Sequence, residues 1–238
     1  MKSILVFKHM SSQNPGIFRD FASDANVEFV EIDLHAGDAI PPLDTFDGLW
    51  VMGGSMDVWE EAEYPWLIDE KRVIRDVVEN RRMPYLGICL GHQLLAEAMG
   101  GQAGPCPKHE IGLFTINATD AGANHPLLQD LPEPSLWVNV HRAEVTELPP
   151  SATVLASSKN CENHMMQIGD LAYSCQFHPE VCDHTVDEWM KIPGIPEALQ
   201  DLLGIDGLKY FQSSIAAHLQ THNAAARQLF HNWLNLVY

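Results

Sequence analysis

Basic residues are scarce in this chain: its 238 residues include 14 Lys and Arg against 32 Asp and Glu, a net charge of −18. So acidic a surface repels phosphate backbones and anionic lipids, and we expect neither nucleic acid nor a membrane surface as a partner. Long apolar runs are also missing. No stretch approaches a transmembrane span, and the first apolar run is interrupted at Lys8, which leaves it too short for a secretory signal.

Patterns for disulfides, metals and nucleotides are missing as well. The five cysteines are odd in number and irregularly spaced, so without a secretory signal we expect reduced thiols and a cytoplasmic protein. "MGGS" lacks the Lys-Ser/Thr of a phosphate-binding loop, and there is no G-x-G-x-x-G spacing. "HPEVCDH" does not have the spacing of a zinc motif. We therefore expect no metal and no cofactor. The cysteines are Cys89, Cys106, Cys161, Cys175 and Cys182.

The first hundred residues alternate between apolar strands and helices. The pattern predicts strands at 3–7, 27–32, 47–52 and 84–88, and helices at 16–22, 66–82 and 91–99. Asn14-Pro15 supplies a cap residue and a first-turn proline for the first of these helices. This alternation predicts an α/β fold with a flavodoxin-like, doubly wound, mostly parallel sheet and helices on both faces. Ligands of such sheets bind at the carboxyl ends of the strands.

The second half of the chain has a different pattern. Short strand-like runs at 110–118, 136–145, 152–158, 165–169 and 172–180 predict an added antiparallel strand region. After Glu180 the pattern is helical at 185–192, 195–203 and 208–236. No repeat, low-complexity tract or long linker separates these parts. We predict one domain over residues 1–183, with a helical C-terminal extension over 184–238 packed on it.

Cys89 stands at the junction of a predicted strand and helix, in "PYLGICLGHQ". Such a turn is a nucleophile elbow, because it holds the side chain clear of the sheet. Gly87 and Gly91 allow close backbone approach, and the helix dipole favours thiolate over thiol. The backbone N–H of Leu90 is free to donate to an oxyanion. A buried core cysteine is the alternative, and the glycines on both sides favour the nucleophile.

A thiol nucleophile needs a base, and His178 in "QFHPE" is the candidate among twelve histidines. It lies at the end of a predicted strand. In extended geometry residues i and i+2 point to the same side, so Glu180 can reach the imidazole and fix its tautomer. A turn histidine followed by a solvated glutamate is the alternative.

These motifs together resemble the class I glutamine amidotransferases, the family with a Cys-His-Glu triad. "GICLGHQ" and "QFHPE" carry the resemblance, "MGGSMDV" is similar to the family's oxyanion loop, and "WVNVHRAEV" to its segment along bound glutamine. "YPWL" and "LASS" resemble a stand-alone subgroup, GMP-synthase-like or γ-glutamyl-peptidase-like. The resemblance implies that Cys89 forms a γ-glutamyl thioester, that His178 transfers protons, and that Glu180 orients His178.

The resemblance also implies substrate contacts. The backbone N–H groups of Gly54 and Leu90 would form the oxyanion hole. The substrate-binding residues would be Gln93, Met56, Val140, Arg142 and Ala143. The chain departs from the family at Arg142, where glycine is common, and at Ser55-Met56, which replace proline or glycine. Because arginine does not readily adopt a positive φ, we expect a reshaped pocket at the end that holds the α-carboxylate.

Three functions remain open at this point. The first is an amidotransferase-type hydrolase that takes glutamine and releases ammonia to a separate synthase subunit. The second is a γ-glutamyl peptidase that acts on a glutathione-like or other γ-glutamyl compound. The third is a catalytically silent binding or regulatory module, against which the intact triad argues. No synthetase module follows the triad in the sequence, and Arg142 favours the second.

Overall fold

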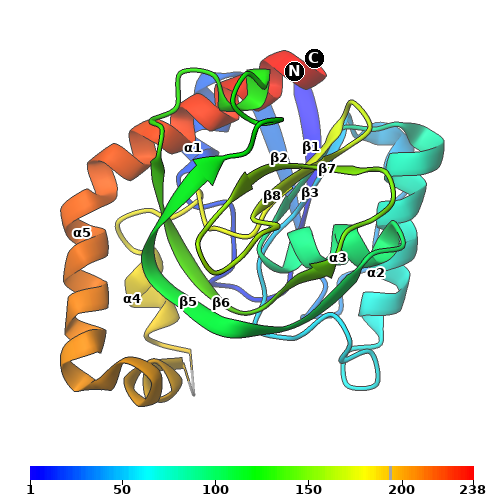
Figure 1. The fold of residues 1–238 in the computed structure, drawn as a ribbon. Helices are drawn as coiled ribbons and strands as arrows, with labels where there is room; N and C mark the ends of the chain where they lie inside the picture. The colour runs from blue at the N-terminus through cyan, green and yellow to red at the C-terminus, as the bar shows by residue number, and fades with distance from the viewer. Residues whose placement is uncertain (193–194) are drawn as a thin grey trace.

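The computed structural model describes residues 1–192 and 195–238, and within them nine strands form one mixed sheet in the order β2-β1-β3-β4-β9-β8-β7-β5-β6. Helices cover both faces, with α1 and α5 on one and α2 and α3 on the other (Figure 1). This confirms the predicted α/β fold. The strands are β1 (Lys2–Lys8), β2 (Val27–Asp33), β3 (Gly48–Val51), β4 (Tyr85–Ile88), β5 (Gln102–Ala118), β6 (Ser135–Glu147), β7 (Ala152–Ser157), β8 (Met165–Ile168) and β9 (Ala172–Cys175).

The parallel half of the sheet consists of β2, β1, β3, β4 and β9. Its order is that of flavodoxin-like sheets, with a switch in winding direction between β1 and β3. Three helices follow β1, β3 and β4 at the predicted places: α1 (Phe18–Asp24), α2 (Trp66–Arg75) and α3 (Leu90–Ala98). The last turns of the predicted helix 66–82 are a π-helix, η2 (Asp76–Arg81), which ends at Arg82 in the left-handed conformation.

The start of α1 differs from the prediction. Asn14 is not its cap: the helix begins at Phe18 with Ile17 in the N-cap position and no side-chain cap. The Asn14 side chain instead accepts a hydrogen bond from the N–H of Gly16, which has φ +51°. Asn14 therefore closes a turn before the helix, because asparagine side chains compete for local backbone N–H groups.

The antiparallel half consists of β8, β7, β5 and β6, and it continues the sheet beyond β9. Here β5 and β6 pair as a long curved ribbon. Their register shifts between Pro105 and Glu110, where β5 bulges opposite Arg142. A bulge bends a strand and re-aims the side chains across from it. The short helices η1 (Leu43–Thr45) and η3 (Pro126–Leu128) lie in connections.

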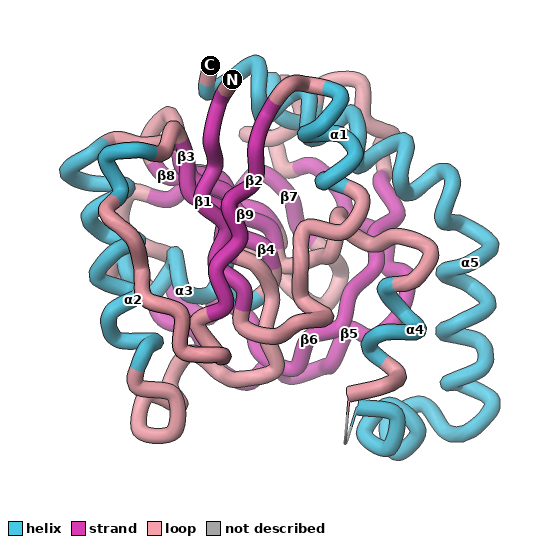
Figure 2. The backbone as a smooth tube through the Cα atoms, turned by 180° about the vertical axis from the view of Figure 1, so that it is seen from behind, coloured by secondary structure: helices cyan, strands magenta, loops and turns pink. Residues whose placement is uncertain are grey.

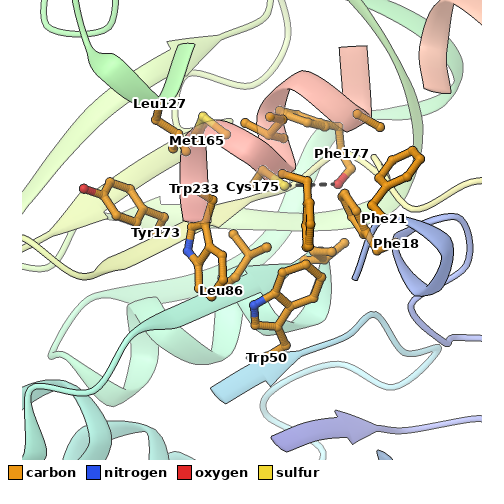
Figure 3. Close-up of a cluster of buried hydrophobic side chains, with 14 of the residues drawn as sticks. Phe18, Phe21, Trp50, Leu86, Leu127, Met165, Tyr173, Cys175, Phe177 and Trp233 are labelled. Carbon is orange, nitrogen blue, oxygen red and sulfur yellow. Dashed lines mark hydrogen bonds between the residues drawn. The ribbon is translucent and has the colours of Figure 1, made fainter. Parts of the chain in front are cut away.

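Alternation along β1 creates two cores, because successive side chains of a strand point to opposite faces. Ile4 and Val6 lie in the core beneath α1 and α5, whereas Leu5 and Phe7 lie in the core beneath α2 and α3. Figure 3 shows the first core, in which Trp50 of β3 is central. Burial of these apolar side chains is the main favourable contribution to folding.

The C-terminal part is helical, as predicted, and consists of α4 (Thr185–Trp189) and α5 (Ile195–Val237). Non-helical backbone at Gly204 divides α5 in two, which explains why the sequence shows two helical segments. The end of α5 packs against α1 beside the sheet, and the two chain ends lie together (Figures 1 and 2). The division of the chain at residue 183 stays a prediction.

Within residues 1–192 and 195–238, no helix combines the length and apolar character needed to cross a membrane. All five cysteines are free and buried. The cytoplasmic location inferred from the cysteines stays a prediction.

We predict that Trp233→Ala destabilises the whole domain. Trp233 is 1% exposed and packs edge to face on Trp50, with ring centroids 5.3 Å apart. Removing a buried Trp side chain costs about 3–5 kcal/mol, which urea unfolding measures. Trp59→Ala is the control, because Trp59 is 43% exposed and should change stability by less than about 0.5 kcal/mol. Unchanged stability in Trp233→Ala would mean that α5 is not part of this core.

Candidate active site

The carboxyl ends of β1, β3, β4 and β9 meet at one edge of the sheet, and each is followed by a residue of the candidate site. His9 follows β1, Gly53 follows β3, Cys89 follows β4, and His178 follows β9. Ligand sites of open α/β sheets form at this edge beside the switch in strand order. The topology therefore brings together residues that are up to 169 positions apart in the sequence.

Cys89 occupies a sharp turn between β4 and α3, with φ 52° and ψ −101°. Its N–H donates to the carbonyl of Cys175 at 2.8 Å, which fixes the turn to the neighbouring strand β9. A side chain at Gly91 would collide with the carbonyl of Val51, and one at Gly87 with that of Gly91. Only glycine fits at these two places, so the flanking glycines permit the turn that presents the thiol.

His178 and Glu180 form a buried pair, with His178 Nδ1 2.7 Å from Glu180 Oε1. Burial alone would lower the pKa of His178. The Glu180 carboxylate and Cys89 outweigh burial and raise that pKa to about 10. The carbonyl of Glu180 accepts a hydrogen bond from Ile17 at 3.0 Å, and Gly16 lies too close to it for any side chain. The turn before α1 therefore holds the backbone of Glu180 in place.

A cavity of about 260 Å³ opens beside Cys89. Nine of the ten sequence-predicted site residues line it, and Glu180 lies behind His178. The structure thus brings the whole predicted set together, whereas the roles of these residues stay predictions. The nine are Gly54, Met56, Cys89, Leu90, Gln93, Val140, Arg142, Ala143 and His178.

Gln93 lies one helical turn from Cys89, as expected, but its amide also has protein partners. Its Nε2 donates to the carbonyl of Ala143 and to Gln176 Oε1, both at 3.1 Å. Gln176 Nε2 in turn lies 3.5 Å from Cys89 Sγ. Both N–H donors of Gln93 are therefore engaged, and Oε1 is left as an acceptor for a ligand with N–H groups.

Arg142 lies on the rim of the cavity, in β6 and opposite the bulge of β5. It is exposed, and no described residue forms a hydrogen bond or ion pair with its guanidinium. Its φ is not positive, so the arginine fits this strand without backbone strain. A positive φ is therefore not required at Arg142, and its guanidinium interacts electrostatically with the Asp57 carboxylate of the same cavity without forming an ion pair with it.

Sequence reasoning missed several residues of this site. His9 is fully buried between the carbonyl of Gly53 and Glu70 Oε1, both 2.9 Å from its ring nitrogens. It stacks on Trp66 with centroids 5.3 Å apart. This pair supports the loop that carries Gly54. The partners are 61 residues apart, so no local pattern connects them.

Two glutamines were also missed. Gln176 belongs to the "QFHPE" motif, so a signal was present for it. Gln13 has none: its side chain lines the cavity with Oε1 buried and without a hydrogen-bond partner among the described residues. In the "HPEVCDH" segment, Cys182, Asp183 and His184 lie close together, whereas the imidazole of His178 pairs with Glu180.

Known proteins resemble the chain over most of its length. A family model described as glutamine amidotransferase class-I matches residues 11–190. The glutamine amidotransferase-like protein YfeJ of Salmonella typhimurium is 34% identical over 209 residues, covering 86% of this chain and 84% of the relative. A glutamine-hydrolyzing GMP synthase component from Sulfolobus acidocaldarius, named as one of its subunits, is 35% identical, covering 60% of this chain and 72% of the relative.

Gamma-glutamyl peptidase 3 of Arabidopsis thaliana is 35% identical, covering 58% of this chain and 56% of the relative. Among solved structures, a glutamine amidotransferase of Thermotoga maritima has a TM-score of 0.84 at 24% identity, covering 98% of both chains. A glutamine amidotransferase of Methylobacillus flagellatus has a TM-score of 0.83 at 28% identity, covering 99% of this chain and 95% of the other. The shared fold therefore includes the C-terminal helices.

We predict that Glu180→Gln lowers the pKa of His178 from about 10. Glu180 is the strongest of the groups that raise this pKa, and removing its charge destabilises the imidazolium. As the pH rises, the ring of the variant therefore loses its proton at a lower pH than the ring of the parent. NMR titration of the ring nitrogens measures the shift, with His178→Asn identifying the signal. Glu28→Gln removes an exposed carboxylate on β2 and should leave the titration unchanged. An unshifted pKa in Glu180→Gln would contradict the pairing.

Proposed function

The chain belongs to the class-I glutamine amidotransferase family, and we propose that it is an amide hydrolase that cleaves a γ-glutamyl amide through a thioester on Cys89. The observation that carries the proposal is the arrangement of three side chains at one edge of the sheet. Cys89 stands on a strained turn at a helix start, and the buried pair of His178 and Glu180 faces it. A nucleophile, a base and a group that orients the base are the components of such a triad.

In the first half-reaction, Cys89 Sγ attacks the γ-carbonyl carbon of the substrate. The C–S bond forms, and the carbonyl oxygen becomes an oxyanion near the backbone N–H groups of Gly54 and Leu90. No described residue accepts a hydrogen bond from the Gly54 N–H, and Leu90 begins α3, where helical N–H groups lack partners. His178 then protonates the nitrogen as the C–N bond breaks, and ammonia or an amine leaves.

In the second half-reaction, water replaces the thiol. His178 takes a proton from the water as its oxygen attacks the thioester carbon. The C–S bond breaks, glutamate leaves, and the sulfur again pairs with a protonated imidazole. Glu180 keeps its charge throughout and holds the ring in one orientation. Gln93 Oε1 accepts from the α-ammonium group of the substrate, because both of its N–H donors are already engaged.

We predict that a glutamine-like diazoketone labels Cys89 selectively and that Cys89→Ser abolishes turnover. The other four thiols are buried away from the cavity, and a thiolate at a helix start reacts faster. Mass mapping of the labelled protein and ammonia release from glutamine or γ-glutamyl peptides are the measurements. Cys182→Ser is the matched control and should keep both labelling and turnover.

The proposal of an amide hydrolase would be contradicted if the folded parent chain released no ammonia or amine from any of these substrates and its Cys89 stayed unlabelled. That outcome would leave a silent binding module as the function. Cys89→Ser should unfold at the same urea concentration as the parent, which separates lost chemistry from lost structure.

For an amidotransferase, the ammonia needs an acceptor. The relative from Sulfolobus acidocaldarius is named as a subunit of GMP synthase. By analogy, we propose that glutamine is the substrate and that a separate synthase subunit receives the ammonia.

A γ-glutamyl peptidase is the second candidate, and Arg142 is the observation that favours it. This exposed cation lines the cavity without an ion pair to any described residue. The lining also includes Leu199 and Leu202 of α5, which add apolar surface to the cavity. A γ-glutamyl peptide has a second carboxylate that a guanidinium binds well. The relative from Arabidopsis thaliana is named as a gamma-glutamyl peptidase.

We predict that Arg142→Gly lowers kcat/KM for γ-glutamyl peptides by at least about tenfold, which corresponds to about 1.4 kcal/mol in the transition state. Hydrolysis of free glutamine should be unchanged or faster, since glutamine has no second carboxylate. Steady-state kinetics on both substrates is the measurement. Arg82→Gly is the control: it removes an equally exposed cation at a left-handed position that suits glycine. Equal effects on both substrates would favour the amidotransferase.

A further inference from the structure

Three side chains that the triad does not use converge behind the substrate cavity. Glu110 comes from β5, His141 from β6, and His164 from the segment before β8. Glu110 Oε2 lies 2.8 Å from His164 Nε2 and 3.3 Å from His141 Nε2. One ligand atom from each residue lies within 4.8 Å of the other two, and all three side chains are buried. Such convergence from three separate strand regions is not produced by local sequence.

No lysine or arginine among the described residues balances the charge of this cluster. Among the described residues, the carboxylate of Glu110 has only the two histidines as ion-pair partners. Nearby Glu144 adds a second carboxylate, whose Oε2 is buried and has no hydrogen-bond partner among those residues. Burying a carboxylate without a compensating cation is costly. The cluster therefore favours a bound cation.

The hydrogen bonds of His141 show where a cation fits. Its Nδ1 lies 3.1 Å from the carbonyl of Ala143, which only accepts, so Nδ1 carries the proton. In the neutral ring the lone pair of Nε2 then points at Glu110 Oε2, which is also an acceptor. Two acceptors 3.3 Å apart repel each other unless a proton or a metal ion lies between them. A ring that donates Nδ1–H to a backbone carbonyl is the usual arrangement of a metal-binding histidine.

We propose that Glu110, His141 and His164 bind one divalent transition-metal ion, with zinc as the best fit. Two imidazoles and a carboxylate are a set of ligands typical of zinc, with a water as the fourth. Ligand atoms of a tetrahedral zinc stand about 3.3 Å apart, so the pair of Glu110 and His141 is already at that separation. Opening the shorter contact between Glu110 and His164 by about half an ångström, and bringing the two imidazole nitrogens, which lie within 4.8 Å of each other, to the same separation, gives the tetrahedral spacing.

Supporting contacts surround the site. Ser158 Oγ donates to the other oxygen of Glu110 at 2.6 Å, and Ala143 supports His141. The outer nitrogen of His164 is buried without a partner among the described residues, so this ligand is the least supported. We therefore expect zinc that exchanges and that a chelator removes. His141 lines the substrate cavity, which gives the ion its entry path.

The metal site is connected to the nucleophile. The carbonyl of Ala143 accepts from both His141 and Gln93, and Gln93 continues through Gln176 to Cys89 Sγ. An ion bound to Nε2 of His141 would fix the imidazole ring, and the Nδ1–H of that ring holds the Ala143 carbonyl. Metal occupancy thereby stabilises the substrate-binding segment of β6. The inference does not depend on which amide the enzyme cleaves.

Zinc titration of the chelator-treated protein, followed by calorimetry and by thermal unfolding, tests the proposal. Cys89→Ser serves as the parent in every arm, so that the catalytic thiol offers no ligand. We expect one zinc per chain and a higher unfolding temperature. His164→Gln in the same background keeps a polar side chain of similar size, and should bind zinc at least about tenfold more weakly. His184→Gln is the matched control, because His184 belongs to an exposed cluster with Cys182 and Asp183.

Three outcomes would overturn the proposal: no zinc binding by the Cys89→Ser parent, the same affinity in His164→Gln as in the parent, or a loss of binding in His184→Gln alone. Unfolding temperatures measured without zinc show whether each variant is folded as well as the parent. If His164→Gln fails to fold, Glu110→Gln replaces it as the variant that removes a ligand and keeps the shape. Since the readout is binding, failure of the amide hydrolase proposal leaves this test unaffected.

Discussion

The turn at Cys89 depends on how closely α3 can approach the sheet. Gly91, in the first turn of that helix, lies against the carbonyl of Val51 on β3, and Gly87 lies against the carbonyl of Gly91. The hydroxyl of Tyr85 donates to the same Gly91 carbonyl at 2.7 Å. Any larger residue at either glycine would push the helix away and move the thiol out of the cavity. The positive φ at Cys89 is strained, and this close packing is what maintains it.

Three buried histidine–glutamate contacts involve segments around this turn. His9 with Glu70 holds the loop that carries Gly54, His178 with Glu180 faces the thiol, and the Glu110 cluster connects β5 and β6 to His164. Buried charges do not stabilise a fold by themselves, because their desolvation offsets much of their attraction. They do fix orientation. Each contact holds either a backbone segment or a ring that faces the substrate cavity, and rigidity of that kind is what a reaction site requires.

The C-terminal helix serves both the core and the cavity. Its far end buries Phe230 and Trp233 against Trp50, whereas its near end places Leu199 and Leu202 at the cavity wall. Leu202 is 45% exposed, and Arg142 is exposed at the rim of the same cavity. The cavity is thus lined in part by a segment that follows Glu180 in the sequence.

The sequence by itself determined the parallel part of the fold and the position of the candidate nucleophile. The spacing of apolar residues that marks a strand or a helix is local, so the strands at 3–7 and 27–32 and the helix at 66–82 were recognisable from the apolar pattern alone. The glycines around Cys89 and the two-residue spacing of His178 and Glu180 are equally local. The register of the β5–β6 ribbon is not, because a one-sided bulge before Glu110 changes which residues face each other without changing the apolar pattern.

Only the tertiary structure decided which polar groups meet. His9 and Glu70 are 61 residues apart, and Glu110 meets His164 across 54 residues. From the sequence alone, each of these side chains would be predicted to be a solvated polar residue between apolar ones. Their burial follows from the way strands β1, β5 and β6 are placed beside the helices and each other. Hydrophobic periodicity indicates which face of a helix or strand is buried. It does not indicate which polar side chain of a distant helix or strand packs against that face, so these contacts could not be predicted.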